Sequence, residues 1–244
     1  MKKNNDKATY KNIATYTQED HYENIKESFK KLSDLVFYDG HGLEPSSNIL
    51  DVGCATGALI KFFHEKLSCN YTGVDISDKL LQVAKENMPK HNWRAGDALS
   101  LPTDFTDYFD VSLCIGLLGI FDESDAKKVL NEITRCTKKG GRAYILSQFN
   151  EYDVDVHVAH RKYNDSNSVG DWEKGWNIFS ERTVKKWLDK DFDSVNFIDF
   201  SMPFDLPAKD DPVRTWTIRD SEQRIRLTNG LKLLVDLKFI EIHV

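Results

Sequence analysis

The sequence predicts an α/β fold in which a mostly parallel sheet carries helices on both of its faces. Short apolar runs alternate with segments whose apolar residues recur every three or four positions, and glycines stand where the first run gives way to the first such segment. Parallel neighbouring strands need crossover connections, and these are usually helical. We expect a single domain over 1–244, with a helical cap over about 1–43 and a lid or substrate segment over about 149–180.

The first two predicted elements are a packing helix and a buried strand. A helix between residues 18 and 38 is indicated by apolar side chains at steps of three and four, namely Tyr22, Ile25, Phe29, Leu32 and Val36. Glycines at 40 and 42 stop this helix. After Pro45, the apolar run 48–53 is typical of a buried first strand.

Strands and helices alternate from there to residue 147. Further strands are predicted at 71–76, 93–95, 109–115 and 142–147. Helices are predicted around 59–67, at 80–88, and from 124 until the glycine pair 140–141. Ser77 is placed to cap the second of these helices.

Beyond residue 148 the pattern changes. The segment 149–176 is rich in His, Tyr, Trp, Asn and Asp and shows no clean period, so we expect a lid with a short helix in it. A helix at 181–189 and a strand at 195–200 follow. Alternating residues then predict a hairpin between 216–218 and 225–227, and a last strand at 240–244.

Composition narrows the class of protein. The formal net charge is −6, apolar residues make up 40% of the chain, and no apolar run approaches the roughly 20 residues of a membrane span. Basic clusters are too short for a partner bound through many phosphates. The four cysteines show neither metal-ligand spacing nor a disulfide pattern. We therefore expect a cytoplasmic protein with no membrane, nucleic-acid or metal partner.

The first strand-to-helix turn and the end of the second strand predict a nucleoside site. Gly53 and Gly57 stand at the two ends of the turn, where glycine allows the backbone to pass close to a ligand. The second strand ends at Asp75, 22 residues beyond Gly53, where a carboxylate can accept both hydroxyls of an adenosine ribose. The two features together are a much stronger signal than either one alone.

Two further strand ends point to the same crevice. Gly96, Asp97 and Ala98 follow the third strand, where the carboxylate can take an adenine amino group and the Ala98 amide can donate. The fourth strand ends at Cys114 and Ile115, at the carboxyl edge where ligands bind in doubly wound folds. Cys114 is equally well explained as a small buried residue at a strand end.

Over roughly 48–148 the chain resembles the class I S-adenosylmethionine-dependent methyltransferases. The segments that carry the likeness are 51–57 (DVGCATG), 73–77 (GVDIS), 96–99 (GDAL) and 110–115 (DVSLCI). The resemblance implies a Rossmann-like, doubly wound sheet of seven strands in the order 3-2-1-4-5-7-6, with the last strand antiparallel. It also implies S-adenosylmethionine as the cofactor, S-adenosylhomocysteine as its product, and no metal.

The first of these segments backs the methionine part of the cofactor in that family. By this resemblance Gly53, Cys54, Ala55 and Gly57 line that part of the site. Ala55 is a departure, because the family usually has a glycine there. Its methyl group narrows the room beneath the cofactor.

The same resemblance assigns roles to five other residues. Asp75 binds the ribose, Ile76 packs on the adenine, and Asp97 binds the adenine amino group. Asp51 holds the amino end of the cofactor through the loop or a water, and Tyr16 closes over the cofactor. An alternative for Asp51 is a bond to the loop backbone or a cap on the next helix.

Candidate catalytic residues lie after the fifth strand. His157 and His160 are three positions apart, so on a helix they would share a face near the acceptor side of the crevice. Either can act as a general base that removes a proton from an attacking hydroxyl or amine. A solvated pair on a lid is the alternative interpretation, and it stays open.

The predicted function is methyl transfer from S-adenosylmethionine to an O or N atom of a small polar metabolite, by a monomer or homodimer. The tail 214–230 is similar to that of bacterial methyltransferases of saccharide and capsule-precursor pathways. An NAD(P)-dependent oxidoreductase shares the first strand, turn and ribose acid, but it needs a glycine where Ala55 stands. Methylation of RNA, DNA or protein is a third hypothesis. It is disfavoured by the net acidity and by the absence of an Asn-Pro-Pro-aromatic motif after the fourth strand.

Overall fold

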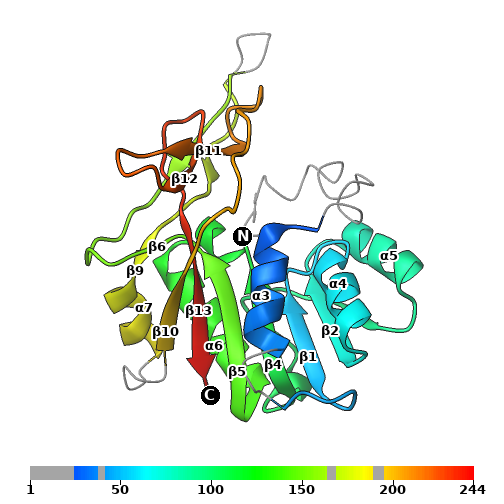
Figure 1. Cartoon of the computed structure of the whole chain (residues 1–244). Helices are drawn as coiled ribbons and strands as arrows, with labels where there is room; N and C mark the ends of the chain where they lie inside the picture. The colour runs from blue at the N-terminus through cyan, green and yellow to red at the C-terminus, as the bar shows by residue number, and fades with distance from the viewer. Residues whose placement is uncertain (1–24, 38–41, 164–168, 189–194) are drawn as a thin grey trace.

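Seven strands form one sheet in the computed structural model, which describes residues 25–37, 42–163, 169–188 and 195–244 (Figure 1). The strands are β1 Asn48–Val52, β2 Asn70–Asp75, β3 Asn92–Ala95, β4 Phe109–Ile115, β5 Thr137–Ser147, β10 Val195–Phe200 and β13 Leu237–His243. Their order across the sheet is β10-β13-β5-β4-β1-β2-β3. β1 to β5 pair in parallel, whereas β13 is antiparallel to both β5 and β10. The predicted fold class and strand order are confirmed.

Helices cover both faces of this sheet. They are α3 Glu27–Phe37, α4 Ala58–Lys66, α5 Asp78–Asn87, α6 Glu123–Cys136 and α7 Glu181–Leu188. α3, α4 and α5 pack with one set of buried side chains, which includes Ile49 and Tyr144. α6 and α7 pack with a second set, which includes Leu50 and Ile145. Because consecutive residues of a strand point to opposite faces, the two sets form separate cores on the two sides of the sheet.

Side-chain caps mark the starts of α5 and α6. Ser77 Oγ accepts a hydrogen bond from the Leu80 amide at 3.4 Å, so it caps α5 as predicted. α6 is capped by Asp122, whose carboxylate accepts from the Asp125 amide at 3.1 Å, two residues before the predicted start. The predicted end of α6 at the glycine pair is wrong. The helix ends at Cys136, and β5 takes up the following residues with an irregular register against β4.

The described part of 149–180 does not contain the short helix that we expected. It contains the two-residue strands β6 Phe149–Asn150, β7 Ala159–His160, β8 Glu173–Lys174 and β9 Phe179–Ser180. Antiparallel pairing joins Val156 with Ile178, β7 with β8, and Tyr163 with Val169. The chain therefore runs out and back as one antiparallel arm, defined here as 156–163 with 169–178. Alternation of valine with other residues over 154–158 is a strand signal that a search for a helical period overlooks.

A hairpin stands near the arm. β11 Thr215–Arg219 and β12 Ile225–Asn229 pair antiparallel, as predicted, and Figure 1 shows them beyond the upper end of the seven-stranded sheet. No helix among the described residues is long and apolar enough to cross a membrane. Of the predicted helical cap, α3 is described, whereas Tyr16 lies outside the described residues.

Candidate functional site

The turn between β1 and α4 separates two pockets, and Gly53 lines both of them. Gly53 has a φ of 79°, a conformation that favours glycine. A Cβ built on it would lie 3.0 Å from Leu117 Cδ2, which is closer than packed carbon atoms normally come. The turn therefore needs a residue without a side chain at the point where the two pockets meet.

The first of the two, which we call the β2 pocket, collects the ends of three parallel strands. Its lining residues are Val52, Gly53, Val74, Asp75, Ile76, Gly96, Asp97, Ala98, Leu117 and Phe121. Six of the residues predicted from sequence to bind a nucleoside are therefore brought together, as expected where the carboxyl ends of parallel strands meet at one edge. Ile76 is 44% exposed although it is a large apolar residue, which suits a side chain that packs on a ligand.

Asp75 is held in a fixed orientation within the β2 pocket. One carboxylate oxygen accepts from the Ala55 amide and the other from the Ser77 amide, each at 2.9 Å. A carboxylate oxygen can accept more than one bond, so both remain able to take a hydroxyl. Burial raises the pKa of Asp75, and the amide hydrogen bonds oppose this shift.

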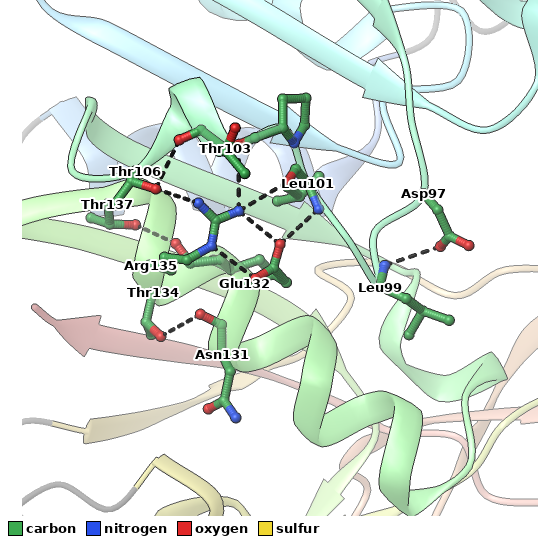
Figure 2. Close-up of polar contacts among 12 residues, drawn as sticks. Asp97, Leu99, Leu101, Thr103, Thr106, Asn131, Glu132, Thr134, Arg135 and Thr137 are labelled. Atoms are coloured by element: carbon green, nitrogen blue, oxygen red, sulfur yellow. Dashed lines mark hydrogen bonds and ion pairs between the residues drawn. The ribbon is translucent and has the colours of Figure 1, made fainter.

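Asp97 is set by a turn of its own. Its Oδ1 accepts from the Leu99 amide at 3.0 Å, as Figure 2 shows, and the Ser100 amide donates to the Asp97 carbonyl at 2.9 Å. These two bonds close a tight turn directly after β3. The turn fixes the position of the Asp97 side chain.

The second pocket, which we call the α3 pocket, has a cavity volume of about 250 Å³ and lies on the other side of Gly53. Its lining residues are Lys26, Ser28, Phe29, Asp51, Gly53, Cys54, Ala55, Thr56, Ala58, Leu59, Ile115, Gly116, Leu146 and Leu237. Asp51, Gly53, Cys54, Ala55 and Ile115 were predicted from the sequence.

Asp51 and Lys26 give the α3 pocket its charge. Asp51 is 3% exposed, and burial together with the nearby Asp75 raises its pKa to about 7, while the Lys26 ammonium pulls the pKa down. An acid and a lysine at one apolar pocket match the ammonium and carboxylate of an amino acid.

Several lining residues escaped the sequence analysis. Lys26 lies just before α3, and Phe29 lies on the first turn of that helix. Lys26 Nζ is 5.2 Å from the Phe29 ring centre. Leu117 and Phe121 follow β4 and close the β2 pocket. Leu117 lies two residues after the end of β4, which was a usable signal, whereas no motif marks Phe121 or Lys26.

Two of the predicted cofactor residues that the structure describes line neither pocket. Cys114 is fully buried, and burial raises the pKa of its thiol, which fits a small core residue at a strand end. Gly57 has a φ of 81°, and a Cβ on it would lie 2.4 Å from Trp93 Cη2. Gly57 is therefore needed for packing of the turn against Trp93.

The expectation that His157 and His160 share a helical face is wrong. Both lie in the extended antiparallel arm, where residues an odd number apart point to opposite sides. His157 is exposed and lines an outer pocket with Asp122 and Lys174. Neither histidine lines the β2 or the α3 pocket.

His160 is packed into the arm. Its ring centre lies 5.0 Å from that of Trp176, and its Nε2 lies 3.8 Å from the Glu173 carboxylate. Its Nδ1 is buried without a hydrogen-bond partner among the described residues. Within the same residues, no three His, Cys, Asp or Glu side chains form a group that could hold a metal ion.

Known methyltransferases match this chain in sequence. Residues 49–141 match the family described as Methyltransferase domain. The chain is 30% identical over 107 residues to a demethylmenaquinone methyltransferase of Renibacterium salmoninarum, covering 44% of each protein. It is 29% identical over 110 residues to a ubiquinone/menaquinone biosynthesis C-methyltransferase of Campylobacter jejuni, covering 43% of this chain and 46% of that one. The match thus spans less than half the length of these relatives.

The fold extends the likeness to the whole chain. An S-adenosylmethionine-dependent methyltransferase from Clostridium acetobutylicum superposes with a TM-score of 0.56 and 16% identity, over 97% of this chain and all of that one. At this identity the superposition shows the fold alone. The family match, by contrast, covers every residue that lines the β2 pocket. Residues 49–141 of this chain therefore match a methyltransferase domain, and the fold that contains them is that of S-adenosylmethionine-dependent methyltransferases.

Proposed function

We propose that the chain binds S-adenosylmethionine across the β2 and α3 pockets and transfers its methyl group to a small-molecule acceptor. The observation that carries the proposal is the placement of two acids on either side of Gly53, with Asp75 in the β2 pocket and Asp51 in the α3 pocket. The cofactor joins a nucleoside to an amino acid. A ligand that lies across Gly53 offers its ribose to one acid and its ammonium to the other.

The β2 pocket takes the adenosine in this proposal. Asp75, already oriented by two amides, accepts the two ribose hydroxyls. Ile76 and Phe121 supply apolar surface for the adenine ring, and Asp97 accepts from its amino group while the Ala98 amide donates to the ring.

The α3 pocket takes the amino-acid part. Asp51 binds the ammonium directly, and Lys26 binds the carboxylate, which adds a cofactor residue to those predicted from sequence. Ala55 narrows this part of the α3 pocket by a single methyl group. Its amide stays engaged with Asp75.

The remaining α3 pocket wall is apolar and belongs to the acceptor. When bound, the cofactor supplies a methyl group on a sulfonium, which is already an activated electrophile. The task of the chain is to hold the acceptor in line and to exclude water. This wall is lined by Phe29, Ile115, Leu146 and Leu237. In this proposal the same side chains pack on the amino-acid part of the cofactor and on the acceptor.

Two classes of acceptor follow from different observations. The sequence favours an O or N atom of a small polar metabolite, including a saccharide or capsule precursor. The apolar wall of Ile115, Leu146 and Leu237 supports instead methylation of carbon in an apolar molecule, the activity in the name of the C. jejuni relative. Turnover of tritiated S-adenosylmethionine with a panel of sugars and a panel of hydroquinones separates the two classes.

A general base takes up the proton that a neutral hydroxyl or amine loses on methylation, or the proton that a methylated carbon loses. Neither histidine lines the α3 pocket, so this role requires the arm to bring one to the acceptor. His160 is the better candidate, because the Glu173 carboxylate lies 3.8 Å from its Nε2 and can orient the ring. An unchanged kcat in a His157→Ala/His160→Ala double mutant would exclude both histidines as the base.

Calorimetry tests the cofactor itself. We expect heat of association with S-adenosylmethionine and S-adenosylhomocysteine, and none with NAD or NADP. The opposite result would replace the proposal by the oxidoreductase hypothesis. Salt-sensitive binding of RNA would instead favour a macromolecular acceptor. We propose that the protein is a monomer or a homodimer. Analytical ultracentrifugation distinguishes these two states.

A further inference from the structure

Asn177 joins the antiparallel arm to the segment 117–121, which closes the β2 pocket and which we call the roof of that pocket. Its side chain is 1% exposed. Its Oδ1 accepts from the Val158 amide on the opposite strand of the arm at 2.8 Å, and its Nδ2 donates to the Phe121 carbonyl at 2.8 Å. Its own amide donates to the Gly119 carbonyl at 2.9 Å. One buried residue therefore satisfies polar groups of two segments that are far apart in sequence.

The segment that Asn177 holds is part of the cofactor site. Phe121 lines the β2 pocket together with Leu117, and Gly119 lies in the single 3-10 turn, Leu118–Ile120, between them. A Cβ on Gly119 would lie 2.6 Å from Gln148 Oε1, so this turn is packed closely at the end of β5. Movement of the arm at Asn177 therefore has to move the roof of the pocket or break these hydrogen bonds.

Two further observations show that the chain is constrained around Asn177. Lys174 lies on β8 of the arm, and its Nζ donates to Asp122 Oδ2 at 3.2 Å. Asp122 is the residue that follows Phe121. Trp176, which precedes Asn177, has a φ of 56°, a conformation that bulky residues adopt only when their surroundings hold them. Hydrogen bonds of Asn177 and Lys174 therefore hold the arm against the segment that follows β4.

We propose that Asn177 is a positioning residue that couples the arm to the cofactor pocket, so that cofactor bound against Phe121 closes the arm over the acceptor side. The proposal rests on the proposed function, because the ligand is the cofactor. Coupling between two sites is reciprocal: a ligand that favours the closed arm binds more tightly by the same factor by which it closes the arm.

Limited proteolysis measures this coupling. The whole protein is digested with trypsin with and without saturating S-adenosylhomocysteine, and cleavage after the exposed Arg161 and Lys162 is timed by mass spectrometry. In the wild type we expect the ligand to slow cleavage by about fivefold or more. In Asn177→Ala we expect this ratio to approach one and the Kd for S-adenosylhomocysteine to rise correspondingly. A purely structural side chain would speed cleavage equally in both conditions and leave the ratio unchanged.

Two other variants keep the test valid if Asn177→Ala folds poorly. Lys174→Ala removes an exposed contact between the same segments and should lower the ratio by a smaller factor. Asn150→Ala is the matched control, because the Asn150 side chain donates to the Val154 carbonyl and accepts from the Tyr152 amide, both within its own segment, and the variant should leave the ratio at the wild-type value.

An unchanged ratio in both Asn177→Ala and Lys174→Ala would overturn the proposal, as would an equal fall in Asn150→Ala. Heat of association with S-adenosylhomocysteine but no slowing of cleavage in the wild type would overturn the coupling alone. No heat at all would remove the proposed function together with it.

Discussion

Glu132 Oε2 accepts hydrogen bonds from Arg135 Nη2 and from the Leu101 amide, each at 2.7 Å (Figure 2). Arg135 also donates to the Leu101 carbonyl at 3.0 Å and to Thr106 Oγ1 at 2.6 Å. This pair on α6 holds the loop that begins with Asp97 after β3. The adenosine side of the proposed site is therefore anchored to a helix on one face of the sheet.

Glu132→Gln should loosen that anchor. The variant loses charge-assisted bonds to Arg135 and Leu101, so we expect the free energy of unfolding to fall by about 1–3 kcal/mol in urea titrations. Lys128→Ala is the control, because Lys128 forms an exposed pair with Asp125 on the same helix and should cost less than about 1 kcal/mol. Equal losses in the two variants would contradict a special role for Glu132.

Cofactor binding should depend on the protonation of Asp51. Its pKa is raised to about 7, so the carboxyl is mainly protonated below pH 7 when no ligand is bound. An ammonium favours the ionised form, so binding of S-adenosylhomocysteine should release a proton, and affinity should fall by up to about tenfold per pH unit below pH 7. Calorimetry in two buffers of different ionisation enthalpy measures the released proton.

The same group has the opposite effect on stability. A raised pKa in the folded state means that the ligand-free protein loses stability as pH rises from the ordinary value of an aspartate, 3.8, to about 7. Asp51→Asn should therefore be more stable than the wild type at pH 8 and should bind S-adenosylhomocysteine weakly, without this pH dependence. A pH dependence of binding that survives in Asp51→Asn would assign the proton to another group.

Gly57→Ala should destabilise the protein severely. The new Cβ would lie 2.4 Å from Trp93 Cη2, and the Trp93 ring cannot easily move because its Nε1 donates to the Met88 carbonyl at 3.0 Å. Overpacking and the left-handed φ together should cost about 3 kcal/mol or more in chemical unfolding. Gly140→Ala, with the same φ of 81° and open space around it, should cost only about 1–2 kcal/mol.

Asp75→Asn should abolish tight cofactor binding. A carboxamide places an NH₂ group against the amide of Ala55 or Ser77 and leaves one oxygen for the ribose. We expect the Kd for S-adenosylhomocysteine to rise by about 100-fold. Asp78→Asn, an exposed acid at the start of α5, should change it by less than about twofold. A small effect of Asp75→Asn would mean that the ribose lies elsewhere.

The β2 pocket could be predicted from sequence because local signals create it. Gly53, Asp75 and Asp97 each stand at the end of an apolar run, and parallel strands bring such ends together without further information. The strand order followed from the family resemblance and is confirmed by β13 lying between β5 and β10.

The α3 pocket and the arm could be predicted only in part. Lys26 and Asp51 line the same pocket because α3 packs on the sheet, and no spacing in the sequence records that arrangement. The arm was missed for a different reason. Its pairing joins Val156 with Ile178 across a segment whose aromatic and polar composition hides the two-residue period.

The place of β13 has a consequence for synthesis of the chain. Among the described strands, β10 has β13 as its sole neighbour, although β10 is made first. As the polypeptide leaves the ribosome, the five parallel strands can assemble while β5 keeps an open row of backbone donors and acceptors. That row is closed only once 237–243 have emerged, so a nascent chain paused before this point should be a preferred client of chaperones.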